Sequence, residues 1–277
     1  MENIEIKTPA KINIGLNITS KRPDGYHNIE SIFYPVRLFD ILNMELSDTL
    51  SINSNNTRLV MEDGNSIIKA LHIMEKETGN KLNIKIYLEK NIPIGAGMGG
   101  GSSDGAAALI ALNKIFDLKF NQKKLRELAL QIGSDAPYFI NPVPSIALSR
   151  GEVLKEIKFN FQCPVLIINP GIYISTKWAY ENLTKHSGDK LLSNIPDLNN
   201  IDLLKLKNIL TNDFEKVVFS KYPEIENIKN QLYESGAIFA LMTGSGSTVY
   251  GIFQDKISAE KAKEKFPIDY FRFIHSV

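Results

Sequence analysis

The chain has 277 residues, of which 43% are hydrophobic and 23% are charged, a composition typical of a folded globular protein. Its formal net charge of +1 excludes an overall field that would attract nucleic acid or an anionic membrane. The single cysteine excludes a disulfide within the chain. The N-terminus has neither the basic start nor the apolar stretch of a signal peptide, so we expect a cytoplasmic protein, and nothing specifies its oligomeric state.

Residues 11–18 alternate strictly and predict a half-buried strand. The isoleucines and leucine at even positions share one face, whereas Lys11 and Asn13 share the other. Lys11 has small or uncharged neighbours on this polar face, so it could bind a carboxylate or place positive charge beside a phosphoryl group. The alternative is a solvated lysine at a strand edge.

A turn follows at Arg22-Pro23-Asp24-Gly25, directly before Tyr26 and His27. The next predicted helix spans 65–79 and ends at Gly79. Asn65 and Ser66 begin this helix, where they could hold a nucleotide or simply cap the helix.

A strand over 82–90 leads into the segment that is most informative about function, residues 93–109, in which five of the seven positions 95–101 are glycine. Glycine leaves its amide N–H unobstructed and accepts the positive φ angles that a loop around an anion requires. A helix over about 103–116 follows, with Ser102 or Ser103 expected at its N-cap, where the helix dipole favours phosphate. The segment therefore predicts a phosphate-binding loop.

Three other interpretations of this loop are a Walker-type loop, a dinucleotide fingerprint and a flexible linker. A Walker-type loop is excluded because Gly100 is not followed by Lys-Ser or Lys-Thr. A dinucleotide fingerprint is formally present as Gly95-x-Gly97-x-x-Gly100, but the preceding strand alternates and no βαβ unit closes after the helix. A flexible linker fits poorly with the small, apolar helix that follows.

A helix over 122–132 ends at Gly133, and Asp135 follows among small and apolar neighbours. From the residues alone, a catalytic carboxylate and a helix-capping or turn-forming aspartate are equally good interpretations of Asp135.

The chain changes character near residue 150, so we expect domains at 1–150 and 151–277. Beyond 150 the pattern predicts strand 164–169, helix 175–183, a helical stretch over about 201–235, strand–loop–strand over 239–253, helix 258–266 and strand 270–276. Strands and helices mix without regular βαβ alternation, which indicates an α+β protein of two domains with mixed or antiparallel sheets.

Three motifs in order resemble those of the GHMP kinases. Residues 93–103 resemble the family's P-x-x-x-G-L-G-S/G-S-S motif for ATP, with Met98 in place of the usual leucine. The two others are Pro9-Ala10-Lys11-Ile12-Asn13-Ile14-Gly15-Leu16 and Met242-Thr243-Gly244-Ser245-Gly246-Ser247-Thr248-Val249. The resemblance covers nearly the whole chain and implies a GHMP kinase-like fold and a phosphotransferase that uses ATP with Mg²⁺.

The resemblance also assigns site residues. It makes Asp135 the catalytic carboxylate and Lys11 its partner. ATP would be bound by Pro93, Gly95, Gly97, Met98, Gly99, Gly100, Gly101, Ser102, Ser103, Asn65 and Ser66. No acidic metal pair is visible near the loop, so we expect Mg²⁺ to bind phosphate oxygens and water, with a serine hydroxyl as the candidate protein ligand.

The segment Arg22 to His27 resembles one branch of the family that phosphorylates a polyol linked to cytidine diphosphate, a small-molecule substrate. Tyr26 and His27 would face the cytidine part, Asn13 the polyol, and Tyr180 would stack on cytosine, with ordinary core packing as its alternative. Trp178 and Tyr173 are less favoured for that role. Thr176, Gly244 and Ser245 would also contact substrate, although Gly244-Ser245 alone could be a simple β-turn.

Three rival functions remain at this stage. They are another small-alcohol kinase of the same family, a catalytically silent nucleotide-binding relative, and a dinucleotide-dependent oxidoreductase. The presence of both Lys11 and Asp135 argues against silence.

Overall fold

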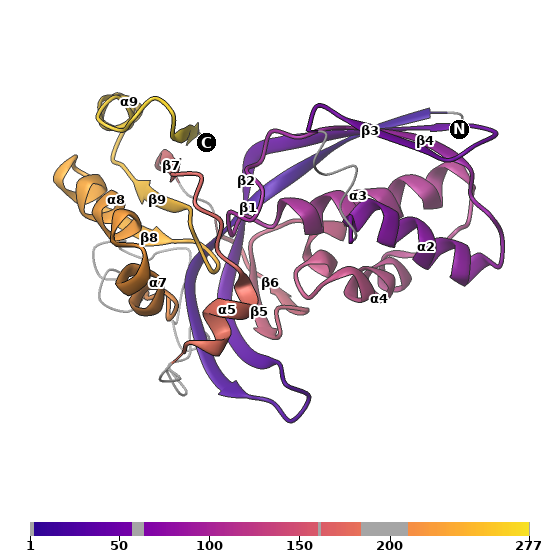
Figure 1. The fold of residues 1–277 in the computed structure, drawn as a ribbon, viewed down its shortest axis with the longest axis horizontal. Coiled ribbons are helices and arrows are strands. Elements are labelled where there is room, and N and C mark those ends of the chain that lie inside the picture. Colours follow the sequence, from indigo (N-terminus) through magenta and orange to yellow (C-terminus); the bar gives the residue numbers. More distant parts are fainter. Residues whose placement is uncertain (1–2, 57–63, 160–161, 184–209, 277) are drawn as a thin grey trace. The chain divides into compact units, whose positions relative to one another are not determined.

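The computed structural model describes residues 3–56, 64–159, 162–183 and 210–276, and these form two compact units that interleave along the chain (Figure 1). Unit 1 comprises Met1–Ala10, Leu38–Ile92 and Gly99–Pro142, and unit 2 comprises Lys11–Arg37, Pro93–Met98 and Val143–Val277. The long strands β1 (Asn3–Lys21) and β2 (His27–Leu46) contribute residues to both. The division into domains at 1–150 and 151–277 stays a prediction.

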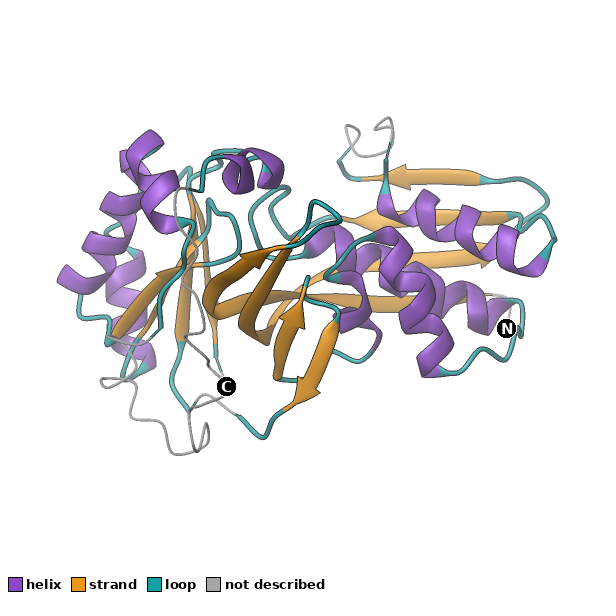
Figure 2. Cartoon of the chain, turned by 90° about the horizontal axis from the view of Figure 1, so that it is seen from below, coloured by secondary structure: helices purple, strands orange, loops and turns teal. Residues whose placement is uncertain are grey.

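Unit 1 places helices on one side of a small mixed sheet. β4 (Ile84–Glu89) pairs antiparallel with Ile41–Leu46 of β2 and parallel with β3 (Ser51–Ser54). Every second side chain of β4, beginning with Ile84, is buried, because one face of the strand meets the helices. These are α2 (Ser66–Thr78), α3 (Gly100–Ile115), α4 (Gln122–Ile132) and the short 3₁₀ helix η1 (Ala136–Ile140), and Figures 1 and 2 show the first three together on one side of β3 and β4.

The N-cap of α3 differs from the one predicted from the sequence. We expected Ser102 or Ser103 there, but the N-cap is Gly99, with φ 71° and ψ 14°, and both serines lie in the first turn. Because glycine accepts this left-handed conformation without strain, the backbone enters the helix three residues earlier than with a cap at Ser102, or four earlier than with a cap at Ser103. The amides of Gly100 and Gly101 therefore belong to the open end of the helix.

Unit 2 contains a second sheet and the remaining helices. Its strand order is β10 (Phe271–His275), β7 (Val165–Asn169), β9 (Val249–Ile252) and β8 (Phe239–Met242), and neighbouring strands in this order pair antiparallel. α8 (Pro223–Glu234) packs on β8 and β9, while α9 (Lys256–Lys263) packs on β7 and β10. α5 (Thr176–Glu181) and α7 (Glu215–Lys221) complete the described helices, and β5 (Ser145–Ser149) pairs with Ile29–Phe33 of β2 and with β6 (Val153–Glu156).

The α+β class with mixed and antiparallel sheets is confirmed. The helix predicted over 122–132 has those bounds, and the predicted end at Gly79 is a left-handed C-cap with φ 70°. The helical stretch at 201–235 contains α7 and α8, although its first nine residues lie outside the described residues. No helix in the described part of the chain is long and apolar enough to cross a membrane.

β2 was missed by the sequence analysis, and its burial explains why. Residues 29–34 are buried consecutively, so they do not alternate, and Pro35 follows them. A run without period-two alternation that meets a proline does not read as a strand. β3, β5 and β6 are only four or five residues long and were missed as well.

Candidate active site

The first motif and the glycine loop are joined through their main chains within unit 2. The Lys11 amide donates a 3.0 Å hydrogen bond to the Met98 carbonyl. Lys11 is only 2% exposed, and its ammonium donates to the side-chain oxygen of Asn13 and lies 4.7 Å from the centre of the Phe33 ring. The alternative of a solvated strand-edge lysine is therefore wrong.

Asn13 connects three segments of unit 2. Its side-chain NH₂ donates to Ser31 Oγ at 2.8 Å, and its main-chain carbonyl accepts from the Tyr250 hydroxyl at 3.0 Å. Its amide donates to Thr243 Oγ1 at 2.9 Å, and that hydroxyl in turn lies 3.2 Å from the Asn13 side-chain oxygen. Since Asn13 is buried and each of its polar groups has a partner, it orients the Lys11 ammonium, whereas its contact with substrate stays a prediction.

The glycine loop and the third motif pack backbone to backbone in unit 2. A Cβ on Gly97, which has φ 76°, would lie inside contact distance of the Thr243 carbonyl oxygen. A Cβ on Gly244 would lie 2.8 Å from the Gly97 carbonyl oxygen. Two chain segments approach this closely only when neither carries a side chain, so the glycines at 97 and 244 are a packing requirement. Gly244-Ser245 is therefore more than a simple β-turn.

The C-terminal loop is fixed by two further contacts. Asn212 donates from its side-chain amide to the carbonyls of Met242 and Gly244, at 2.7 and 2.8 Å. The hydroxyls of Thr176 and Ser245 are 2.9 Å apart, so two predicted substrate contacts lie together.

The second half of the glycine loop opens α3 in unit 1. Ser103 is buried, and its hydroxyl has no hydrogen-bond partner within the described ranges. Ser66, at the start of α2, lies 3.5 Å from where a Cβ of Gly101 would stand, so these two predicted ATP contacts are neighbours. Asn65 caps α2 by accepting a hydrogen bond from the Ile67 amide at 2.9 Å, which is the alternative to nucleotide binding that the sequence analysis gave for this residue.

Asp135 occupies the N-cap position of η1 in unit 1, but its side chain makes no capping hydrogen bond. The aspartate is half-buried and is followed by a 3₁₀ turn in which every residue from Ala136 to Ile140 is buried. The capping interpretation therefore explains the position of the residue but not its side chain, and a catalytic role for the carboxylate stays a prediction.

The residues predicted to bind cytidine belong to an aromatic cluster in unit 2. The His27 and Tyr180 rings stack with centroids 4.7 Å apart and planes 15° from parallel. Phe214 meets Tyr180 edge-on at 4.9 Å, so Tyr180 is held by two rings while remaining half-buried. Tyr26, 51% exposed, carries the Arg150 guanidinium 4.4 Å from its ring centre.

The turn before these rings is held by an ion pair and hydrogen bonds. Arg22 forms an ion pair with Asp24 at 2.9 Å and also donates to Ser149 at 2.9 Å. The hydrogen bond from Arg22 is the largest cause that lowers the pKa of the Asp24 carboxyl. Asp24 also accepts from the Tyr26 amide at 3.1 Å, so the turn contacts the start of the Tyr26-His27 segment.

The less favoured aromatics lie elsewhere in unit 2. Tyr173 is 69% exposed and covers Gly95, where a Cβ would stand 2.6 Å from its ring. The Trp178 ring lies beneath the Lys221 ammonium at 4.2 Å. Within the described residues, no three His, Cys, Asp or Glu side chains gather as a metal site, so none of them is assigned to Mg²⁺.

Two family models match the chain, the GHMP kinases N terminal domain over residues 65–141 and the GHMP kinases C terminal domain over residues 194–271. A 4-diphosphocytidyl-2-C-methyl-D-erythritol kinase from Chloroherpeton thalassium is 39% identical over 93% of both chains. The chain belongs to the GHMP kinase family.

Other relatives of this GHMP kinase agree. The enzyme of the same name from Thermodesulfovibrio yellowstonii is 38% identical and is matched over 97% of its length by 98% of this chain. The crystal structure of a 4-(cytidine 5'-diphospho)-2C-methyl-D-erythritol kinase superposes with a TM-score of 0.80 at 28% identity, covering 98% of each chain. The mevalonate kinase of Methanococcus jannaschii, at 15% identity and a TM-score of 0.75, shares the fold.

The sequence analysis of this GHMP kinase missed several residues that contact the predicted site residues or lie beside them, some in unit 2 and some in unit 1. They are Ser31, Arg150, Asn212 and Phe214, and the charged residues Asp40, Lys90 and Asp104. Only Asp104 carried a signal, because it directly follows the two serines of the glycine loop. The others lie outside the motifs and become visible only when the chain is folded.

Proposed function

We propose that this GHMP kinase transfers the γ-phosphoryl group of ATP to the 2-hydroxyl of 4-diphosphocytidyl-2-C-methyl-D-erythritol, a step in non-mevalonate isoprenoid precursor synthesis. The observation that carries the proposal is the aromatic cluster that contains Tyr26, His27 and Tyr180. It is supported by relatives named 4-diphosphocytidyl-2-C-methyl-D-erythritol kinase, which match at least 93% of this chain. We further propose that the reaction takes place in the cytoplasm.

ATP fits the glycine loop and the start of α3. Positive φ angles at Gly95, Gly97 and Gly99 turn the backbone through the loop. The amides that open α3 and the buried Ser103 hydroxyl are donors suited to phosphate oxygens. Mg²⁺, when bound with the triphosphate, would offset phosphate charge, and a serine hydroxyl of the loop is the protein oxygen we assign to it.

The transfer itself asks little covalent chemistry of the protein. It needs in-line positioning, compensation of developing charge and an acceptor for the hydroxyl proton. We assign proton acceptance to the Asp135 carboxylate and charge compensation to the Lys11 ammonium, which Asn13 orients.

Recognition of the acceptor rests on unit 2. Cytosine is planar and would stack on Tyr180 or Tyr26, while the His27 imidazole can hydrogen-bond the edge of the base. Because His27 and Tyr180 stack on each other, cytosine would displace one of the two rings or lie on the exposed face of Tyr26. Thr176 and Ser245 supply hydroxyls for the diphosphate or polyol.

A substrate screen tests the proposal. Purified protein, ATP and Mg²⁺ are incubated separately with the cytidylyl substrate, galactose, homoserine and mevalonate, and ADP release is followed. We expect ADP only with the cytidylyl substrate. Turnover of another alcohol would contradict the assignment of Tyr26 and His27, and absence of ADP with all four would contradict the kinase function.

A further inference from the structure

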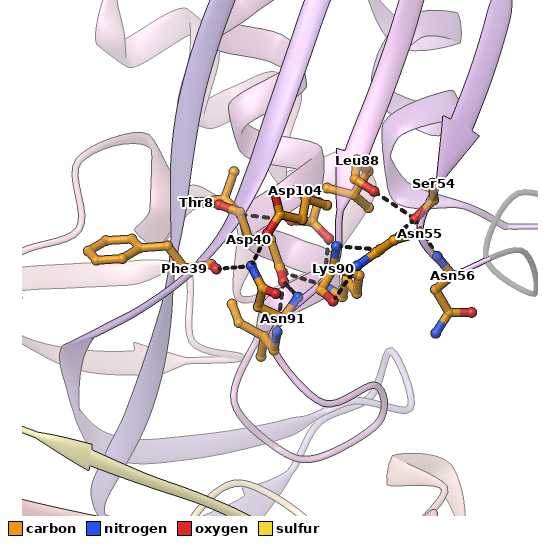
Figure 3. Close-up of polar contacts among 12 residues, drawn as sticks. Thr8, Phe39, Asp40, Ser54, Asn55, Asn56, Leu88, Lys90, Asn91 and Asp104 are labelled. Carbon is orange, nitrogen blue, oxygen red and sulfur yellow. Dashed lines mark hydrogen bonds and ion pairs between the residues drawn. The ribbon is translucent and has the colours of Figure 1, made fainter.

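A buried cluster of charges lies in unit 1 beside the start of α3 (Figure 3). The Lys90 ammonium, just beyond β4, contacts the carboxylates of Asp40 on β2 at 2.5 Å and Asp104 on α3 at 2.7 Å. Thr8, on β1, donates its hydroxyl to the other oxygen of Asp104 at 2.8 Å. The three charged side chains are almost fully buried. The ammonium thus ties the end of β4 to β2 and α3, and the Thr8 hydroxyl adds β1 through Asp104.

Asp40 also fixes the chain that leads into the glycine loop. Its second carboxylate oxygen accepts from the amides of Asn91 and Ile92, at 2.6 and 2.7 Å. The main chain of Lys90 is held in turn by Asn55, whose side-chain oxygen accepts from the Lys90 amide at 2.8 Å. The three residues before Pro93 therefore have a defined path.

Lys90 reaches the far end of the loop as well. A Cβ on Gly100, the first residue of α3, would stand 2.9 Å from the Lys90 ammonium nitrogen. Asp104 lies one turn further along the same helix. The cluster therefore contacts both the segment that enters the loop and the helical turn whose amides we assign to phosphate.

The cluster contains two acids and one base, and this imbalance affects Asp104. Burial is the largest cause that raises the pKa of Asp104 to about 6, and Asp40 on β2 raises it further. Lys90, beyond β4, and the Thr8 hydroxyl on β1 oppose the rise. The charge of the cluster therefore changes close to neutral pH.

We propose that Thr8, Asp40, Lys90 and Asp104 form a positioning cluster that holds the first turn of α3 in the geometry that binds ATP, and that ionised Asp104 is required for this hold. Protonation of Asp104 removes the charge that anchors Lys90 to the helix and weakens ATP binding. The inference rests on the proposed use of ATP. The affinity for the phosphoryl acceptor, which we assign to residues of unit 2, does not depend on the cluster.

The test compares wild type with Asp104→Asn by calorimetric titration of a non-hydrolysable ATP analogue between pH 5 and 8. The readout is the ratio of the two dissociation constants, because titration of the nucleotide itself cancels in that ratio. We expect a ratio near one at pH 5, rising to about fivefold above pH 7, the loss of roughly one net hydrogen bond. Glu45→Gln is the control, because it removes an exposed ion pair between Glu45 on β2 and Lys85 on β4. Its ratio of dissociation constants should be one at every pH from 5 to 8.

Thr8→Val gives a second readout that keeps all three charges, should Asp104→Asn fail to fold. Loss of the hydroxyl raises the pKa of Asp104, so the inflection in ATP affinity should move to higher pH. A merely structural role for Thr8 would weaken binding without moving the inflection.

Three results would overturn the inference. They are a ratio for Asp104→Asn that does not change with pH, an unmoved inflection in Thr8→Val, and an equal loss of affinity for the cytidylyl substrate. A wild-type chain that binds the ATP analogue but phosphorylates no alcohol would contradict the proposed function and leave the binding test intact. A chain that binds no analogue would overturn both.

Discussion

At the scale of single residues, the site depends on how buried polar side chains restrain one another. Asn13 is the clearest case, because its amide, carbonyl and side chain each have a partner, and one of those partners is the Lys11 ammonium. A lysine fixed in this way has lost its rotamer freedom before substrate arrives, which is the condition for effective charge compensation.

Asp135→Asn tests the proposed proton acceptor. The amide cannot take up the hydroxyl proton, so we expect kcat to fall by about 10² to 10⁴ while both KM values stay within a few-fold. Steady-state kinetics with ATP and the cytidylyl substrate measure both. Asp117→Asn is a matched control, because that aspartate is exposed and pairs with Lys119 on the surface. Unchanged turnover in Asp135→Asn would remove Asp135 from the mechanism.

Tyr180→Ala tests the cytosine contact. Loss of a base-stacking ring costs about 1–3 kcal/mol, so the KM for the cytidylyl substrate should rise about 5- to 150-fold with little change in the KM for ATP. Tyr87→Ala, at an exposed position on β4 in unit 1, should change neither value. If Tyr180→Ala alters both KM values equally, the ring has a packing role instead.

At this scale the sequence predicted those site residues that lie within a recognisable motif. Lys11, Asn13, Gly97 and Gly244 were predicted from motifs, and the structure brings them together within unit 2. Phe214 and Arg150 could not be predicted, because ring packing and cation–π contacts depend on the fold and leave no local pattern.

At the scale of elements, the loops are set by backbone approach. Residues 93–98 and 242–246 touch through glycines, and Asn212 holds the second of these loops by two carbonyls. The helix that follows the first loop begins at a left-handed glycine, which places bare amides at its open end. The loop geometry is therefore built from glycine conformations that another residue would not adopt.

Gly97→Ala tests this packing. The positive φ alone costs about 1 kcal/mol, and the contact with the Thr243 carbonyl adds to it, so we expect about 3 kcal/mol of lost stability together with weaker ATP binding. Gly79→Ala separates the two effects, because that glycine has φ 70° with open space around it and should lose only about 1 kcal/mol. Equal losses in urea unfolding would contradict the close approach.

Element prediction succeeded where periodicity and caps agreed, as in α4, which is capped by Asn121 and ends at Gly133. It failed at β2, where consecutive burial removes the alternation, and at the start of α3, where a glycine replaces the expected serine cap.

At the scale of the whole molecule, each of the two units is formed by several separate segments of the chain, and β1 and β2 contribute residues to both units. Sequence patterns of local range could indicate two regions but could not show this interleaving, because it depends on long-range strand pairing. Unit 1 also encloses the charged side chains around Lys90 among its buried residues.

Asp104 contributes to the pH dependence of global stability. Its pKa is raised to about 6 in the folded chain, chiefly by burial, so its contribution to stability is present below its unfolded pKa and is lost as pH rises through about 6. Asp104→Asn should therefore be at least as stable as wild type at pH 7.5, and this advantage should shrink toward pH 4. Urea unfolding at several pH values measures the difference, and a variant that loses more stability at pH 7.5 than at pH 4 would contradict the sign.

The most direct measurement is ³¹P NMR of the product formed from ATP and the cytidylyl substrate. The carbon at position 2 carries a methyl group and no hydrogen, so a phosphate on its oxygen should give a new monoester resonance without three-bond coupling to a proton. We predict that singlet, with ADP formed in equal amount. A proton-coupled monoester, or ADP without any new monoester, would contradict transfer to the 2-hydroxyl.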